Sequence, residues 1–297
     1  MPDNGRMARW TWLWPALACT VLAACGSSSP GPGDDNISVS PQNTTLLVGV
    51  NRVSIALLDQ QQNPVRAGGV RMQVVDARGV NVATVSMHSI GPEYGGIPVY
   101  VGLARFPDVG EYQYLVTATG SGDQRLNGHA FVTVVLKGSS VPVGAAAPAL
   151  HQPVLGDAGV TLAMLDSGIP PDDWHSETIA QGLAAHRPMV LYFGDPAYCP
   201  SKTCGPTHQI LEQLCAQLCG QLLFEHIETY YPAGTPGPQA HVNPAFSAFG
   251  LQTDPWIYFV NASGVVADRY EGPVTLADLV QSAQGTLAGK VPAAGVG

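Results

Sequence analysis

At 297 residues, the chain is long enough for two modest domains, each with its own hydrophobic core. Hydrophobic residues make up 45% of the sequence and charged residues 12%, a balance that excludes a largely disordered chain and suits a secreted globular protein. The formal net charge of −9 argues against a nucleic-acid partner, because phosphate groups are bound by clustered lysine and arginine.

The first 25 residues have the pattern of an export signal. Arg6 and Arg9 precede an apolar run over residues 10–24. At about 15 residues the run is shorter than the roughly 20 that a membrane-spanning helix needs, and it matches the apolar segment of a signal peptide. The run ends in Leu22-Ala-Ala-Cys25, which resembles the bacterial lipobox, whose cysteine receives a diacylglycerol before cleavage leaves it as the first residue.

The lipobox resemblance implies a place outside the cytoplasm. Residues 1–24 would be removed, Cys25 would carry the lipid, and residues 25–36, rich in Ser, Pro and Gly, would form a flexible tether. We therefore expect a protein anchored through its lipid to the extracytoplasmic face of the cell membrane, in the periplasm or on the cell surface. The alternative is an ordinary secretory peptide, or a short anchor, with a chance cysteine.

Residues 37–137 consist of short alternating runs separated by turn residues. The pattern predicts strands at residues 53–58, 70–75, 112–118 and 131–136. Short strands at such spacing, with no helical period, favour an antiparallel β-sandwich. The region resembles the immunoglobulin-like modules of bacterial envelope proteins, although it has no cysteine pair to make that resemblance specific. It has no cluster of His, Asp or Glu that indicates chemistry, so we expect a spacer or docking module.

Strands and helices alternate in the second half of the chain. Residues 138–153 are predicted as a linker and residues 154–290 as an α/β domain. The expected elements, in chain order, are strand 160–165, helix 176–185, strand 188–193, helix 206–219, strand 221–227, helix 243–249, strands 256–260 and 265–270 as a hairpin, and helix 276–283. This order is that of the thioredoxin fold. The sequence therefore predicts an all-β immunoglobulin-like sandwich followed by an α/β thioredoxin-like domain.

Two motifs match the active site of the thioredoxin family. The strand at 189–193 leads into Cys199-Pro-Ser-Lys-Thr-Cys204-Gly-Pro206 and then an amphipathic helix. Further along, Thr253-Asp-Pro-Trp256 precedes a strand, as the cis-proline segment of that family does. Roughly residues 155–288 share the resemblance. It implies catalytic roles for Cys199 and Cys204, a cis peptide bond before Pro255, and substrate binding by Asp254, Pro255 and Trp256.

The spacing of the two cysteines departs from the thioredoxin pattern. Four residues separate Cys199 from Cys204 where thioredoxins have two, and Thr207 stands where a Cys-Gly-Pro-Cys motif would end. Counted from Phe193, Cys199 holds the nucleophile position; counted from Gly205-Pro206, Cys204 does. Cys204 is expected at the N-terminus of the next helix, where the helix dipole and free N–H groups stabilise a thiolate. We therefore favour Cys204 as the thiol with the lower pKa.

Thiol–disulfide exchange with envelope proteins is the function that this pair indicates. The extracytoplasmic compartment permits disulfides, and one that closes so short a loop stabilises the fold little. A structural disulfide in an inactive, binding or structural lipoprotein is one alternative. Copper handling is another, because the Sco family joins two cysteines to a histidine on a thioredoxin fold, and His208, His226 and His241 are possible ligands here. The cysteines of Sco proteins are spaced Cys-x3-Cys, whereas four residues separate Cys199 from Cys204. No resident cofactor or metal is predicted.

A second cysteine pair, Cys215 and Cys219, lies one turn apart on the predicted helix, too far along it to share a metal site with Cys204. We expect a buried structural role, because Cys215 adjoins the apolar stripe of the helix. That stripe consists of Ile210, Leu211, Leu214 and Leu218. Side chains at i and i+4 of a regular helix are too far apart for an unstrained disulfide, so a bond would require the helix to unwind near Gly220.

Overall fold

The computed structural model describes residues 35–200, 202–234 and 237–290. By contact density the described residues belong to one unit. The predicted signal peptide of residues 1–24 and the predicted lipidation site Cys25 lie outside them. In the described part of the chain, no helix is both long and apolar enough to cross a membrane.

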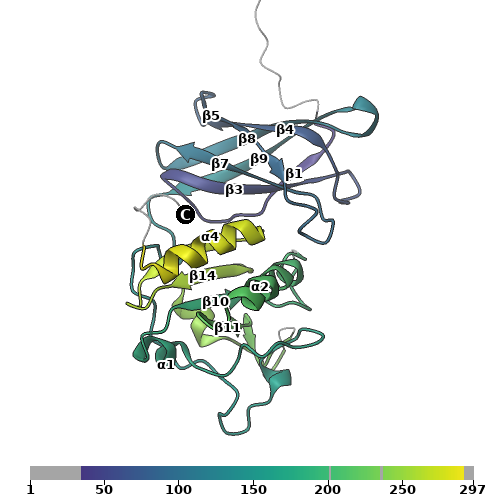
Figure 1. The fold of residues 1–297 in the computed structure, drawn as a ribbon. Coiled ribbons are helices and arrows are strands. Elements are labelled where there is room, and N and C mark those ends of the chain that lie inside the picture. The colour runs from purple at the N-terminus through teal and green to yellow at the C-terminus, as the bar shows by residue number, and fades with distance from the viewer. Residues whose placement is uncertain (1–34, 201, 235–236, 291–297) are drawn as a thin grey trace, which may run out of the picture. The chain divides into compact units, whose positions relative to one another are not determined.

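The N-terminal part of the described chain forms two β-sheets (Figure 1). The first has the order β1 (Ser38–Pro41), β3 (Gly49–Leu58), β7 (Val99–Phe106), β6 (His88–Ser89). The second has the order β2 (Leu46–Leu47), β9 (Arg125–Val135), β8 (Gly110–Thr119), β4 (Gly68–Asp76), β5 (Asn81–Ser86). The four predicted strands are confirmed as β3, β4, β8 and β9, and the other five were not predicted.

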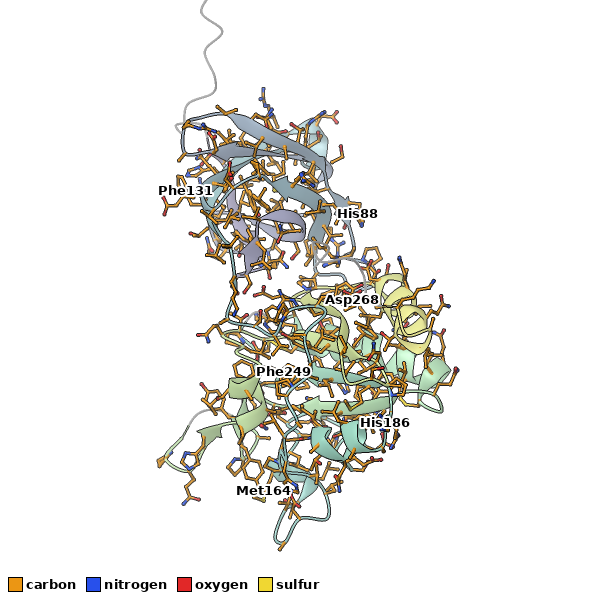
Figure 2. The ribbon with its side chains drawn as sticks, turned by 90° about the vertical axis from the view of Figure 1, so that its left-hand side faces the viewer. His88, Phe131, Met164, His186, Phe249 and Asp268 are labelled. Atoms are coloured by element: carbon orange, nitrogen blue, oxygen red, sulfur yellow. A yellow bond between two sulfur atoms is a disulfide. The ribbon has the colours of Figure 1, made fainter. Side chains whose placement is uncertain are left out.

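The two sheets enclose one hydrophobic cluster, which explains the alternating pattern of the sequence. Met72 and Val74 of β4 and Tyr114 and Val116 of β8 point into it, and each is at most 1% exposed. Residues between them point outward, because successive strand residues face opposite sides of a sheet. Phe131 of β9 is such an outward residue; it is 68% exposed, and Figure 2 shows it at the surface.

The C-terminal part has a four-stranded sheet in the order β11 (Leu223–Ile227), β10 (Met189–Phe193), β14 (Trp256–Val260), β15 (Val266–Glu271). Strands β10 and β11 are parallel, whereas β14 is antiparallel to both β10 and β15. Its helices are α1 (Ile179–Ala184), α2 (Cys204–Leu218), α3 (Pro244–Ala248) and α4 (Leu276–Leu287). Two-residue strands β12 (Tyr230–Tyr231) and β13 (His241–Val242) pair beside it. This arrangement is thioredoxin-like, as predicted.

Alternate residues of the central strands divide between the two faces of this sheet. Val190 and Tyr192 of β10 pack in one cluster with α2 and α4, which lie side by side (Figure 1). Met189, Leu191 and Phe193 pack in another cluster with α1 and α3. Helices therefore cover both faces, which is why these strands are apolar along their whole length.

The prediction of a strand at residues 160–165 is wrong. A 3-10 helix, η2 (Leu162–Met164), occupies this segment, and its backbone hydrogen bonds are local. The edge of β11, where a first strand could pair, instead has a single hydrogen bond from His226 N to Trp174 O of 2.8 Å. Apolar alternation predicts a strand only where a partner edge is available, and here the chain forms a loop over residues 165–178.

Residues predicted as a linker are hydrogen-bonded to strand β15. Gly144 N donates to Val266 O, and Val266 N donates to Ala145 O, each at 2.9 Å. The Arg269 guanidinium donates to three oxygens of the same segment. These are the Ser140 carbonyl at 3.3 Å, the Ser140 hydroxyl at 2.7 Å and the Val141 carbonyl at 2.9 Å. The segment is therefore packed against the thioredoxin-like sheet.

Side chains of strand β7 and of the turn before it also enter the cluster that α2 and α4 cover. Ile90, Tyr94, Val99 and Val101 all belong to it and are at most 3% exposed. An ion pair of 3.2 Å joins Arg52 of β3 to Asp278 of α4. The N-terminal sheets thus contribute directly to the core beside the cysteine helix.

Candidate functional site

The loop between β10 and α2 brings Cys199 and Cys204 together. Cys199 N donates to Asp195 O at 2.9 Å and Lys202 N donates to Cys199 O at 3.1 Å, so the loop is closed by its own backbone. The Cα atoms of Cys199 and Cys204 are 5.9 Å apart, and their sulfur atoms are at disulfide distance. The predicted pairing of these two residues is therefore present.

The two cysteines differ in their access to solvent. Cys204 is the first residue of α2, as predicted, and is 0% exposed. Cys199 lies in the loop and is only half-buried. Cys199 is therefore the less buried residue of the pair. The sequence did not reveal this difference, because it arises from packing over the start of α2.

The predicted cis-proline segment borders the loop. The Asp254–Pro255 peptide bond is cis, as predicted. Sγ of Cys199 lies 3.7 Å from Oδ1 of Asp254. Trp256, the third residue expected to bind substrate, is only 3% exposed and packs on Tyr258 and beneath Arg269.

A buried acidic group adjoins Cys199. Burial, together with the neighbouring carboxylate of Asp195, raises the pKa of Asp254 to about 7. Thr229 joins the two carboxylates, since its N–H donates to Asp195 at 2.8 Å and its hydroxyl donates to Asp254 at 3.5 Å. Burial likewise raises the pKa of Glu228 to about 7. The site therefore holds protons that are exchanged near neutral pH.

Sequence reasoning missed Asp195, Glu228 and Thr229. Their signal is positional: Asp195 follows β10, and Glu228 and Thr229 follow β11, so all three lie at the carboxyl ends of two parallel strands. Polar residues at that edge of a sheet are frequent components of functional sites.

Two buried tyrosines hold the first turn of α2. The Tyr192 hydroxyl donates to the Cys204 carbonyl at 2.8 Å. The Tyr94 hydroxyl contacts the hydroxyl of Thr207, the residue that replaces the second cysteine of a thioredoxin motif. Thr207 is 0% exposed. A contact from the N-terminal part of the chain therefore holds Thr207 in the first turn of α2.

The second pair, Cys215 and Cys219, is also at disulfide distance, with Cα atoms 4.6 Å apart. Helix α2 ends at Leu218, so Cys219 is the residue just past it, and Cys219 N still donates to Cys215 O at 2.8 Å. The expected burial is wrong for Cys219, which is exposed, whereas Cys215 is half-buried. The pair closes the end of α2 and lies apart from the Cys199 loop.

The histidines considered as copper ligands do not join the cysteines. Among the described residues, the donor group around the pair consists of Cys199, Cys204 and Asp254, without an imidazole. His208 and His226 contact Asp172 instead, and His241 lies exposed on β13. The arrangement of two thiolates and a histidine that the copper alternative requires is therefore not formed.

No protein-family model and no curated protein sequence matches the chain. Among solved structures, a thiol:disulfide interchange protein of the thioredoxin family from Chlorobium tepidum TLS is similar over 50% of this chain and 98% of its own, with 15% identity and a TM-score of 0.30. CopC from Methylosinus trichosporium OB3b is similar over 34% and 84%, with 14% identity and a TM-score of 0.23. A DUF4426 family protein from Pseudomonas aeruginosa PAO1 is similar over 30% and 76%, with 9% identity and a TM-score of 0.24. Likeness at this level carries no functional weight, so function rests on the geometry of this chain.

Proposed function

We propose that the chain is a membrane-anchored, extracytoplasmic thiol–disulfide exchange protein that acts through Cys199 and Cys204. The observation that carries this proposal is the asymmetry of the pair. Cys199 is the less buried residue, in a short loop with its sulfur 3.7 Å from an acidic group, and Cys204 is fully buried as the first residue of a 15-residue helix. A disulfide with one reachable sulfur exchanges in a defined order.

The exchange begins when a thiolate of a partner protein attacks Sγ of Cys199. The Cys199–Cys204 bond breaks, Cys204 leaves as a thiolate at the N-terminus of α2, and the partner is joined to Cys199 in a mixed disulfide. A second partner thiolate then attacks the partner's own sulfur in that bond and releases Cys199. The partner loses two electrons and two thiol protons, and Cys199 and Cys204 gain them as two thiols. The reverse sequence reduces a partner disulfide.

Asp254 is positioned to move the proton of Cys199. With a pKa near 7 its carboxyl group holds a proton at neutral pH in a large share of molecules. It can give that proton to the Cys199 thiolate as the mixed disulfide resolves, and accept it in the reverse direction. Pro255, beside it, is the proposed edge on which the partner's backbone rests, together with Asp254.

Trapping with single cysteine variants tests the exchange. In Cys204→Ser the accessible Cys199 keeps its mixed disulfide, because no second thiol resolves it. We therefore expect a covalent adduct with a reduced peptide that carries a single cysteine under mild oxidant, seen as a mass increase that dithiothreitol reverses. In Cys199→Ser the remaining thiol is buried, and the adduct should be absent from the folded protein.

The Cys215→Ser/Cys219→Ser double variant is the matched control, because it also removes a disulfide and should exchange as the wild type does. Equal adduct formation by the two single variants would contradict the assigned order. Absence of an adduct from both, together with a disulfide that resists dithiol until the protein unfolds, would favour a structural disulfide.

The proposed location rests on the lipobox resemblance. Cys25→Ser is expected to leave the export signal uncleaved at this site or to release the protein from the membrane fraction, because the lipid and the cleavage both depend on the thiol. Fractionation and intact mass measure this outcome. A Cys25→Ser protein that stays anchored with an otherwise unchanged mass would refute the lipid anchor.

The N-terminal sheets have a separate proposed role. We assign residues 37–137 to an immunoglobulin-like module that acts as a spacer or docking module between the anchor and the thioredoxin-like domain of residues 154–290. Envelope proteins with thiols or disulfides are the proposed substrates.

A further inference from the structure

A cluster of imidazoles and carboxylates is buried where the loop over residues 165–178 meets strand β11. Asp166, Asp172 and His175 come from the loop, and His226 comes from the middle of β11. Their side chains are at most 5% exposed. One donor atom from each of the four lies within 4.8 Å of the other three.

The separations between these donor atoms match those around a metal ion. Nε2 of His175 lies 3.5 Å from Oδ2 of Asp166 and 3.0 Å from Oδ1 of Asp172. Nδ1 of His226 lies 2.9 Å from Oδ2 of Asp172 and 3.8 Å from Oδ2 of Asp166. Tetrahedral ligands at about 2.0–2.2 Å from Zn²⁺ are about 3.3–3.6 Å from one another, in the middle of this range.

Hydrogen bonding leaves one buried nitrogen of the cluster without a partner. Nε2 of His175 is buried close to two carboxylates, yet neither contact has hydrogen-bond geometry. Nε2 of His226 lies 2.9 Å from the Gly194 carbonyl, which only a protonated nitrogen can approach in this way. Nδ1 of His226 lies at hydrogen-bond distance, 2.9 Å, from Oδ2 of Asp172, a contact that a protonated His226 makes as a donor. In the neutral form that metal binding requires, the Nδ1 lone pair faces the carboxylates, where a cation would satisfy it.

The carboxylates are held in place by an outer layer of donors. Asp166 accepts from Gly168 N at 2.6 Å and from Asp172 N at 2.7 Å. Asp172 accepts from Trp174 N at 2.8 Å, and Nε2 of His208 lies 2.6 Å from its Oδ2. Such outer contacts orient ligands in metal sites, and His226 is oriented in the same way by Gly194.

We propose that Asp166, Asp172, His175 and His226 bind one divalent cation of the zinc class. Two neutral imidazoles and two carboxylates neutralise its charge, and this donor set suits Zn²⁺ better than Cu(I), which prefers thiolates. Four protein ligands leave no open position, so the site is structural. It fastens the loop over residues 165–178 to β11, at the edge where a first strand of the sheet could have paired. The site is independent of the proposed exchange function.

The test uses the full chain with its disulfides oxidised and without a polyhistidine tag, dialysed in metal-free buffer and then incubated with ZnCl₂. Mass spectrometry of the metal content should find about one zinc per chain. At a hundredfold excess over Kd, Zn²⁺ should raise the melting temperature by roughly 5–10 °C. Cobalt in place of zinc should give tetrahedral d–d bands without a thiolate charge-transfer band.

Variants separate this site from the other donors. His175→Ala and Asp166→Asn should lose the metal, whereas His241→Ala, which removes an exposed histidine, should keep it. The Cys199→Ser/Cys204→Ser variant should also keep it, because no thiolate is a ligand. If His175→Ala fails to fold, the zinc contents of wild type and of the Cys199→Ser/Cys204→Ser variant decide whether the site exists. Folded wild type without zinc, or zinc that is lost with the cysteines, would overturn the proposal.

Discussion

Replacing Arg269 with alanine is expected to destabilise the folded chain by about 3 kcal/mol or more, because several buried oxygens lose a charged donor. Arg269 is 8% exposed and donates to the carbonyls of Ser140 and Val141 and to the Ser140 hydroxyl. It also lies over the ring of Trp256, with Cζ 5.5 Å from the centroid. No other group in the described chain donates to these carbonyls in the variant unless the segment moves.

Denaturant unfolding of Arg269→Ala measures this loss, and limited proteolysis should show earlier cleavage within residues 138–148. Arg105→Ala is the matched control, since Arg105 is exposed on β7. A variant as stable and as resistant to protease as the control would show that this segment is a free linker, held by contacts too weak to matter.

Replacing Asp254 with asparagine is expected to stabilise the protein above neutral pH by about 2 kcal/mol, after allowance for the partial exposure of this carboxyl group. Burial and Asp195 raise the pKa of Asp254 from 3.8 to about 7. Between these two values the folded chain keeps a proton that the unfolded chain has released. The free energy of unfolding of the wild type therefore falls as the pH rises from 3.8 to about 7. Above about pH 7, the destabilisation that Asp254 causes no longer changes with pH.

Asparagine carries no charge and can still donate to Asp195, so the variant lacks this decline. The free energies of unfolding of wild type and Asp254→Asn should converge near pH 3 and separate progressively up to about pH 7. Guanidinium titrations across pH 3–9 measure the difference, in which the titrating groups that do not contact Asp254 cancel. Glu111→Gln, an exposed carboxylate on β8, controls for net charge. A difference that does not change with pH would mean that Asp254 titrates normally.

Local signals in the sequence predicted much of the thioredoxin-like region. The apolar runs of β10 and β14, the turn at Asn261, and the Gly-Pro after Cys204 each depend on a few neighbouring residues, and all lie as expected. The cis bond before Pro255 followed from its place ahead of β14. The prediction of a strand at residues 160–165 was wrong because the alternation of apolar residues carries no information about whether a neighbouring strand is available for pairing.

The sequence by itself determined the order of elements from β10 onward, apart from the short pair β12 and β13, and the position of Cys204 at the start of α2. These features follow from periodicity, turn chemistry and helix starts, which are short-range properties. Only the tertiary structure decided that Cys204 is more deeply buried than Cys199, that Asp254 pairs with Asp195, and that Tyr94 reaches Thr207 across 113 positions. It also gathered His226 with Asp172, 54 positions away. These contacts form where distant segments meet on folding, so pKa, access and ligand geometry at the two clusters depend on packing that no local pattern encodes.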